Sequence, residues 1–364
     1  MASLRMKPLE ARITALARMP ATAVSLRDLY RFGSRPNTER RLQNALFLQH
    51  ELPIRMSQRI VELRSLPFGL SNSEQVRSVI DWYSTYVDQL TSFPIPKTDD
   101  DERSFTELLS SNIQGNSTVP TMLSLAVRAA SQRESEAGSS RARSPTEHAR
   151  NALRHSMAQS VLDRFFTARI GLRFLMEHHL HSQEEYSQQG WAGIIKENFC
   201  PSEVIQAAID DATQLCVDDL GDAPPVRVKL PAGGATLTHV PSHIHYILTE
   251  LLKNAMRAVT SRHLATGTLP DIAVTVAFGA DDTCIRISDE GGGIPMDAMD
   301  QIWNYAYTTA PTPLAVMLDD REYPPQQLRQ SALAGYGMGL PLSRLYAQVS
   351  GEWRAGGGRR VLEW

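Results

Sequence analysis

The 364-residue sequence predicts an α+β protein of two domains. Apolar residues recur at helical spacing through the first half of the chain, whereas short strand-like segments alternate with helices after about residue 190. Hydrophobic residues make up 42% of the chain, which is enough for conventional cores. We therefore expect a helical domain over residues 1–185 and a mixed domain over residues 186–364, with the boundary near 183–190.

Helical periodicity runs through the first domain. A helix is predicted over residues 3–19 and ends at Pro20, and a second short helix follows with Gly33 as its cap. A long helix over residues 38–63 is expected to break near Pro53, because proline lacks the backbone N–H that a helix uses. Later helices are expected over residues 76–90, 105–109, 119–130 and 155–181.

Residues 131–150 are polar, rich in Ser and Arg, and have no apolar period, so we predict a flexible insertion there. A phosphorylatable loop at Ser144 is the alternative, and plain disorder is favoured over it. His178, His179 and His181 end the last helix without a carboxylate or further His at a ligand-like offset. We interpret them as helix-end and core histidines rather than as metal ligands.

Strands enter the pattern in the second domain. Residues 193–195 predict a short strand and residues 201–216 a helix. Further strands are predicted over residues 226–230, 272–278 and 284–288.

The composition excludes several classes of protein. A formal charge of -3, from 37 basic and 40 acidic residues, does not favour nucleic acid or an anionic membrane as a partner. The three cysteines lack C-x-x-C spacing and favour a reducing compartment. No apolar run reaches the roughly 18 residues that a membrane-spanning helix needs. Basic residues dominate the first 27 positions, where Glu10 is the one acid; a mitochondrial transit peptide and a basic first helix of the folded domain both fit.

The segment from Glu250 to His263 is the first candidate for chemistry. Glu250, Asn254 and Arg257 fall at i, i+4 and i+7 of a predicted helix, with Lys253 beside them. An apolar stripe on another face predicts packing against a sheet. An acid, a base, an amide and a guanidinium therefore share one face, although an ordinary solvated helix side would look the same.

Two loops supply further polar candidates. Asp289 follows a predicted strand and precedes three glycines, which permit a sharp turn and close approach to a ligand. An ionised carboxylate only accepts hydrogen bonds, which suits the exocyclic amino group of adenine, although an ordinary turn is the alternative. Thr308 and Thr309 open a polar loop that extends to residue 332 and form a weak signal alone.

The segment GYGMGLPLSRLYAQ, residues 335–348, places glycines at alternate positions before a predicted helix with Pro341 in its first turn. Such a turn offers unpaired N–H groups and the positive end of a helix dipole to a phosphate. The spacing matches neither the Rossmann fingerprint nor a P-loop, and alone it is unspecific.

The order of these motifs is more specific than any one of them. A helix with Glu, Lys and Asn, then Asp-x-Gly-x-Gly, Thr-Thr and G-x-G-x-G-L, resembles the Bergerat-type ATP-binding fold of the gyrase, Hsp90 and histidine kinase superfamily. Within it, the chain resembles the mitochondrial 2-oxo acid dehydrogenase kinases over nearly its whole length. The supporting segments include ELPIR at 51–55, RSLPF at 64–68, ARIGLR at 168–173 and LPLSRLYA at 340–347.

The resemblance implies a four-helix bundle followed by a Bergerat-type α/β sandwich. It implies that Glu250 is the general base, that Asn254 holds magnesium between the ATP phosphates, and that Asp289 takes the adenine amino group. Lys253 and Arg257 would neutralise phosphate charge. The other implied cofactor-binding residues are Gly291, Gly293, Thr308, Thr309, Gly335, Tyr336, Gly337, Met338, Gly339 and Leu340.

The implied activity is ATP-dependent phosphorylation of serine on the decarboxylase subunit of a 2-oxo acid dehydrogenase complex in the mitochondrial matrix, which inactivates that subunit. Implied ligands are ATP, magnesium and potassium. Implied partners are the complex, with its lipoyl domain as docking site, and a second copy in a homodimer. Tyr246 and residues 287–289 resemble the branched-chain type, whereas residues 119–122 resemble the pyruvate type. The branched-chain substrate is slightly favoured, and a pyruvate dehydrogenase kinase is the alternative.

Three departures from the family pattern carry expectations of their own. Gly115 stands where the family usually has His, and Glu290 stands where it has Arg, which reverses charge near the nucleotide. The sequence after Gln348 does not match the family's final strands and tail, so we expect a truncated sheet with an exposed edge. A catalytically weak paralogue that acts as a binding module is therefore an alternative. A sensor histidine kinase is disfavoured, because the helical domain has no His in an acid-flanked context.

Overall fold

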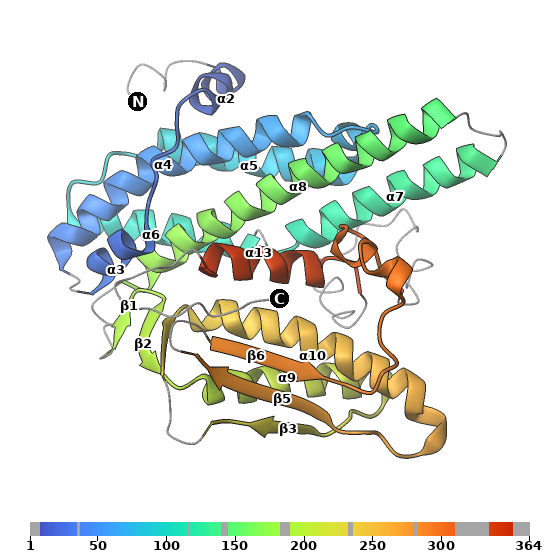
Figure 1. Ribbon diagram of the computed structural model, residues 1–364. Coiled ribbons are helices and arrows are strands. Elements are labelled where there is room, and N and C mark those ends of the chain that lie inside the picture. The colour runs from blue at the N-terminus through green and yellow to red at the C-terminus, as the bar shows by residue number, and fades with distance from the viewer. Residues whose placement is uncertain are drawn as a thin grey trace. The chain divides into compact units, whose positions relative to one another are not determined.

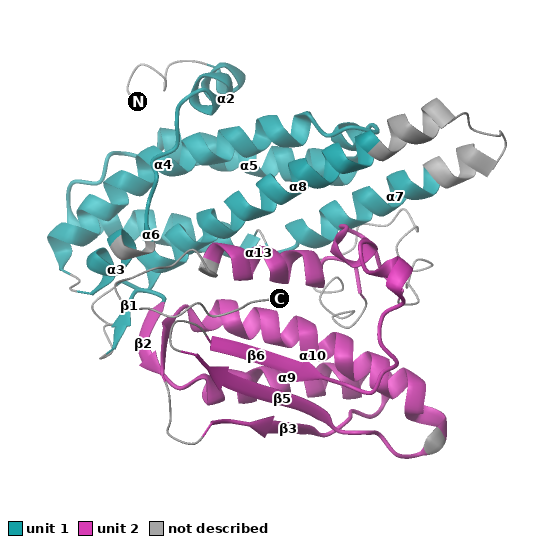
Figure 2. Ribbon diagram, viewed as in Figure 1, with its two compact units in different colours: residues 1–194 teal, residues 195–364 magenta. Residues whose placement is uncertain are grey.

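The computed structural model describes residues 8–34, 37–115, 117–139, 145–182, 190–231, 236–279, 283–309 and 335–351. The chain divides into two compact units, Met1–Ile194 and Ile195–Trp364 (Figure 2). Unit 1 is built almost entirely of helices, and unit 2 combines helices with β-strands (Figure 1). The predicted α+β class is therefore confirmed.

Unit 1 is a bundle in which α4 packs on α2, α5 and α8, and α5 packs on α7. Large aromatic side chains, among them Tyr83, Phe105 and Phe165, are fully buried between these helices. The elements of unit 1 are α2 (Leu9–Ala17), α3 (Leu26–Gly33), α4 (Thr38–Arg64), η1 (Leu70–Asn72), α5 (Glu74–Ser92), α6 (Asp99–Gly115), α7 (Val119–Ser139), α8 (Pro145–Leu180) and β1 (Trp191–Ala192).

Helix α4 is continuous, so the predicted break near Pro53 is wrong. Pro53 lies inside the helix and is buried, as are its neighbours Leu52 and Ile54. A proline inside a helix costs about 3 kcal/mol through the lost hydrogen bond and a steric clash. The ion pair between Glu51 and Arg55, 2.8 Å long, spans the proline on the same helix, and burial of the flanking side chains offsets the remaining cost.

The predicted insertion over residues 131–150 is also wrong where the structure describes it. Helix α7 continues to Ser139, and α8 begins at Pro145. The segment lacks an apolar period, but its Arg, Glu, Gln and Ala residues have high intrinsic helix propensity, and proline suits the first position of a helix. Residues 140–144, including the candidate phosphorylation site Ser144, lie outside the described residues.

Two smaller expectations need correction. Gly33 is the last residue of α3 and Ser34 is the cap, in a right-handed conformation. Glycine is needed at position 33 for space, because a Cβ atom there would lie 2.6 Å from the carbonyl carbon of Ala192. The strand expected over residues 193–195 is instead two strands, because Gly193, with a φ of 58°, and Ile194 form a turn between them.

Of the three histidines predicted to be helix-end and core residues, His178 and His179 lie in the core, and His181 is exposed directly after the end of α8. His178 and His179 are fully buried. The ring of His178 lies 2.9 Å from the carbonyl oxygen of Leu29. His179 lies within 3.2 Å of Asn44, Thr106 and Glu102, which come from two other helices of the bundle.

Among its described residues, unit 2 combines small sheets with the long helices α9, α10 and α13. Strand β2 pairs with β4 in antiparallel orientation. In the second sheet the order is β3-β5-β6, with β3 parallel and β6 antiparallel to β5. The elements are β2 (Ile195–Phe199), α9 (Pro201–Leu220), β3 (Val226–Lys229), β4 (Leu237–His239), α10 (Pro241–His263), η3 (Leu264–Thr266), β5 (Ile272–Phe278), β6 (Thr283–Ser288), η4 (Met296–Ala298), η5 (Gln301–Trp303) and α13 (Gly339–Gly351).

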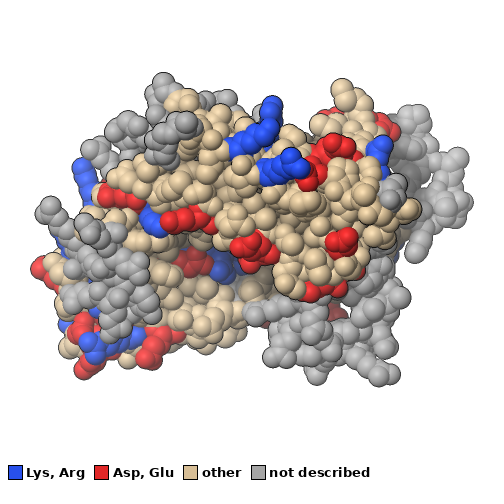
Figure 3. Space-filling view, turned by 90° about the horizontal axis from the view of Figure 1, so that it is seen from below, with Lys and Arg blue, Asp and Glu red and all other residues tan. Residues whose placement is uncertain are grey.

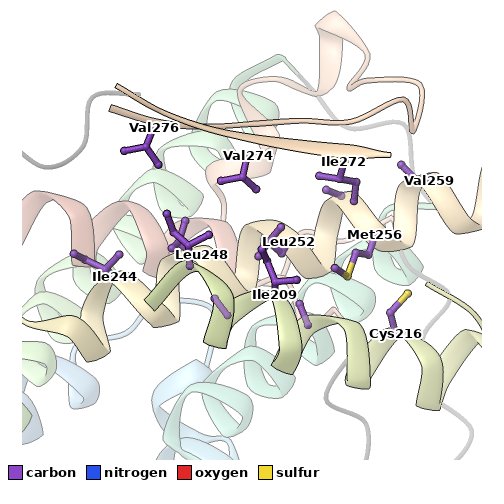
Figure 4. Packing of buried hydrophobic residues seen from close by; sticks show 14 of the residues in the cluster. Ile209, Cys216, Ile244, Leu248, Leu252, Met256, Val259, Ile272, Val274 and Val276 are labelled. Carbon is purple, nitrogen blue, oxygen red and sulfur yellow. The ribbon is translucent and has the colours of Figure 1, made fainter. Parts of the chain in front are cut away.

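The core of unit 2 lies between the β3-β5-β6 sheet and helices α9 and α10. Ile272, Val274 and Val276 point from alternate positions of β5 toward Leu252 of α10 and Ile209 of α9 (Figure 4). Alternate side chains of a strand point to the same face of the sheet, so these three residues share the face that meets the helices. The apolar face of α10 therefore packs against the sheet, and its polar face does not take part in this core.

The charge distribution, the predicted absence of a membrane-spanning helix and the basic N-terminal segment can be compared with the described structure. Acidic and basic side chains are interspersed on the face shown in Figure 3, in keeping with the nearly balanced composition. None of the helices in the described part of the chain combines the length and apolar character that a bilayer crossing needs. Residues 9–17 form α2, and its buried Arg12 donates hydrogen bonds to Thr91 and Asp88, as expected for a helix of the folded bundle.

Candidate functional site

The candidate site is built on α10, which begins nine residues before the predicted start at Glu250. Pro241 occupies the first turn, where its missing N–H has no cost. Ile244, Ile247 and Leu248 extend the apolar stripe toward the N-terminus and bury this additional part of the helix. The catalytic candidates therefore lie in the middle of a long, anchored helix rather than at its beginning.

Glu250 and Lys253 form an ion pair on this helix. The Lys253 Nζ atom lies 2.8 Å from Glu250 Oε1, and the two side chains retain 15% and 20% of their exposure. Asn254, one turn after Glu250, is exposed. The structure thus places a partly covered carboxylate, its ammonium partner and an open carboxamide on neighbouring positions of one helix face.

Arg257 interacts with a different partner. Burial lowers the pKa of its guanidinium, and the carboxylate of Asp219, in α9, partly opposes that shift. The four polar side chains that were expected to act together on α10 therefore have separate surroundings. Glu250 and Lys253 form a pair, Asn254 is exposed, and Arg257 interacts electrostatically with α9.

The turn after β6 lies against the C-terminal part of α10. Asp289 Oδ1 accepts a hydrogen bond of 2.8 Å from the backbone N–H of Gly291, which fixes the carboxylate at the start of the turn. A Cβ atom at Gly291 would lie 2.4 Å from Cβ of Ala258, so only glycine allows this approach. Gly293 has a φ of 75° and open space around it among the described residues.

The same turn contains residues that the sequence did not single out. Gly292 has a φ of 101°, and a Cβ atom there would lie 2.1 Å from Nη1 of Arg262. The ring of His263 lies 3.1 Å from the carbonyl oxygen of Glu290. Arg262 and His263 thus connect the turn to the last turn of α10, and no local sequence pattern signals this docking.

The glycine-rich loop meets the segment that carries the threonine pair. Gly337 has a φ of 70°, and a Cβ atom there would lie 2.4 Å from the carbonyl carbon of Ala306. The N–H of Ala306, itself at a φ of 65°, donates a 3.0 Å hydrogen bond to the Gly337 carbonyl. Thr308, half-buried, and Thr309, exposed, follow within three residues of this contact.

The loop then continues into α13, which packs along α10. The ring of Tyr346 lies 4.9 Å from that of His243 and 4.7 Å from that of Tyr246. At the start of α13, a Cβ atom at Gly339 would lie 2.4 Å from Oε2 of Glu250. Met338 is buried, whereas Gly335, Tyr336 and Leu340 are half-buried.

These contacts bring two of the predicted motifs directly together, because the α13 N-terminus lies against Glu250. The Asp289 turn lies against the same helix about two turns further on, at Ala258. A helix N-terminus and glycines that leave no room for a side chain let backbone N–H groups bind a phosphate. The exposed carboxamide oxygen of Asn254 is a suitable ligand for a hard cation such as magnesium. The residues present therefore fit a magnesium nucleotide.

Comparison with known proteins agrees with this geometry. Residues 239–362 match the family model described as histidine kinase-, DNA gyrase B- and HSP90-like ATPase. Residues 23–196 match the model of the mitochondrial branched-chain alpha-ketoacid dehydrogenase kinase. The fold and the site thus define a protein kinase that joins a helical domain to an ATP-binding domain of the Bergerat type.

Curated relatives narrow the class. The chain is 35% identical over 337 residues to the mitochondrial pyruvate dehydrogenase (acetyl-transferring) kinase of Arabidopsis thaliana, a match that covers 92% of this chain and 86% of the relative. Isozyme 4 of Homo sapiens is 32% identical over 343 residues, covering 91% and 77%. Isozyme 1 of Rattus norvegicus is 31% identical over 348 residues, covering 91% and 73%. The chain belongs to the family of mitochondrial 2-oxo acid dehydrogenase kinases.

Proposed function

We propose that this kinase transfers the γ-phosphoryl group of ATP to a serine on the decarboxylase subunit of a 2-oxo acid dehydrogenase complex, and so inactivates it. The observation that carries the proposal is the position of Glu250, whose carboxylate lies directly at the glycine that begins α13. A general base must lie within hydrogen-bond reach of the hydroxyl proton that it accepts, beside the phosphates. Glu250 satisfies this condition if the glycine-rich loop binds those phosphates.

Nucleotide binding is assigned to three segments of unit 2. Asp289 keeps one oxygen on the Gly291 N–H and presents the other as an acceptor for the adenine amino group. Gly291 and Gly293 allow the backbone to approach the base, and Thr308 and Thr309 offer hydroxyl groups. The loop from Gly335 through Tyr336, Gly337, Met338 and Gly339 to Leu340 binds the phosphates at the N-terminus of α13.

The chemical step requires positioning and charge neutralisation more than covalent help. Asn254 would hold magnesium through its exposed carboxamide oxygen, and the bound ion would supply charge neutralisation between the phosphates. Glu250 accepts the proton from the serine hydroxyl as its oxygen attacks. Arg257 adds positive charge at the end of this helix face, and potassium is a further proposed ligand.

The substrate complex is the finer part of the proposal. Residue patterns around Tyr246 favour the branched-chain complex, and the matched model of the helical domain carries the branched-chain name. The relatives in Arabidopsis thaliana and Homo sapiens are named for pyruvate dehydrogenase. On that ground we propose the pyruvate dehydrogenase complex as the substrate, with the branched-chain complex as the second candidate.

The mitochondrial names of the same relatives support a mitochondrial setting. We further propose the matrix as the location, and a homodimer that docks on the lipoyl domain of the complex, as the family resemblance implies. A binding module without catalytic activity is the competing proposal, because Glu290 puts a negative charge beside the Asp289 turn.

Incubation of the full chain with γ-labelled ATP, magnesium and each purified complex tests both activity and substrate. We expect acid-stable phosphoserine on the decarboxylase subunit of one complex, in larger amount with pyruvate dehydrogenase. Glu250→Gln should lower transfer by about 100-fold or more while ATP still binds. Transfer by Glu250→Gln at the normal rate would remove Glu250 from the mechanism, and acid-labile phosphate would indicate histidine chemistry instead.

A further inference from the structure

The two carboxylate oxygens of Glu250 have different surroundings within unit 2. Oε1 is 2.8 Å from the Lys253 ammonium. Oε2 lies against Gly339, the first residue of α13, where a side chain would come within 2.4 Å of it. The first N–H groups of a helix have no intrahelical acceptor, and the dipole makes this end positive. The carboxylate is thus bonded to an ammonium through one oxygen, and its other oxygen lies close to the N-terminus of α13.

Lys253 is committed to this carboxylate. Its side chain retains only 15% of its exposure, whereas lysine normally keeps its ammonium in water. It lies three positions after Glu250 on the same helix, so the pair meets without any movement of the backbone. A lysine that served a nucleotide phosphate directly would have to give up this bond.

We propose that Lys253 and Gly339 are positioning residues for Glu250. Lys253 fixes one carboxylate oxygen, and the missing side chain at Gly339 leaves room for the other at the start of α13. Lys253 therefore acts on phosphoryl transfer through Glu250 and not through contact with the nucleotide. This inference rests on the proposed kinase function, because it assigns a role relative to the proposed base.

Substitution of Lys253 should change kcat much more than the Kd for magnesium-ATP. Lys253→Met should lower kcat by about 10- to 100-fold, because the base is no longer held in place, and should change the Kd for magnesium-ATP less than about threefold. Lys253→Arg, which keeps the charge, should restore a large part of kcat. Lys229→Met, at an exposed position on β3, is the matched control and should change neither quantity.

A double-mutant cycle tests whether Lys253 works through Glu250. In the Glu250→Gln background, Lys253→Met should lower the residual rate less than about twofold, because the group it positions is already gone. Gly339→Ala should lower kcat as Lys253→Met does. A rise of more than about tenfold in the Kd for magnesium-ATP in Lys253→Met, or an equal loss of rate in both backgrounds, would overturn the inference.

The contact can also be tested apart from catalysis. The same cycle, followed by the thermal unfolding midpoint, should be non-additive if Lys253 and Glu250 are bonded in solution. Additive shifts would overturn the inference even if the wild-type protein proves inactive. An inactive wild type with a non-additive cycle would count against the proposed function alone and support the positioning contact.

Discussion

The two units differ in the exposure and hydrogen bonding of the polar side chains compared below. In unit 1, His179 is buried and has Asn44, Thr106 and Glu102 within 3.2 Å, so this network is closed on itself. In unit 2, Glu250 and Lys253 are only partly covered and Asn254 is exposed. A closed polar network stabilises a fold, whereas partly exposed groups beside crowded glycines can still meet a ligand. We therefore assign a stabilising role to the buried network around His179 and a functional role to the partly exposed residues of α10.

A glycine substitution in each unit should show the largest difference between them. Gly69 in unit 1 and Gly337 in unit 2 both have a φ of 70°, but only Gly337 is crowded by backbone atoms, at 2.4 Å. Gly337→Ala should force the loop away from Ala306 and lower phosphoryl transfer about 100-fold. Gly69→Ala should cost only about 1 kcal/mol of unfolding free energy and leave transfer unchanged. Equal effects of both substitutions on transfer would contradict the assignment of the loop.

The buried network should show the next largest effect. Glu102 is almost fully buried and is paired with Arg41 and His179. Glu102→Ala should lower the free energy of unfolding by about 3 to 5 kcal/mol, because it leaves a covered guanidinium without its partner. Denaturant unfolding measures this loss. Glu10→Ala, which removes the exposed pair with Arg64, is the control and should cost less than about 1 kcal/mol.

Acid should weaken each unit through one buried histidine. Burial lowers the pKa of His178 in unit 1 and of His239 in unit 2 from 6.5 to about 4. Because the folded pKa lies below the unfolded value, stability is present above pH 6.5 and is lost as the pH falls toward 4. His178→Gln and His239→Gln should each reduce the pH dependence of the unfolding midpoint over this range. An unchanged pH dependence in both variants would show that other groups carry it.

Helix capping should give the smallest effect and test the local chemistry of unit 1 alone. Ser25 accepts a hydrogen bond from the N–H of Asp28, whose side chain in turn accepts from the N–H of Ser25. Ser25→Ala should cost about 1 kcal/mol in thermal unfolding. Ser78→Ala, on the exposed side of α5, should change stability by less than about 0.5 kcal/mol. Phosphoryl transfer should be unaffected by either change.

Local sequence patterns predicted β3, β5 and β6 because these strands depend on short-range chemistry, but they missed β4. The strand predicted over residues 272–278 is β5, and Pro341 does lie in the first turn of α13. The continuous path of α4 through Pro53 depends on burial by other helices, which no local pattern contains.

The fine structure of the site was less predictable for the same reason. Ala306 has a left-handed backbone because its N–H donates to Gly337, a contact between segments 31 residues apart by number. Arg262 lies over Gly292 only because the turn docks on α10. The pairing of Lys253 with Glu250 was open to sequence reasoning through their spacing, but the contact of Glu250 with Gly339 was not.

Equilibrium binding of magnesium-ATP to the full chain tests the central claim most directly, with Asp289→Asn as the variant and GTP as the competing nucleotide. The variant keeps an oxygen for the Gly291 N–H but replaces the proposed acceptor of the adenine amino group by a donor. We predict saturable binding of ATP in preference to GTP, and an affinity at least about tenfold lower in the variant. Absence of saturable binding, or equal affinity of wild type and variant for ATP, would contradict the assignment of this site.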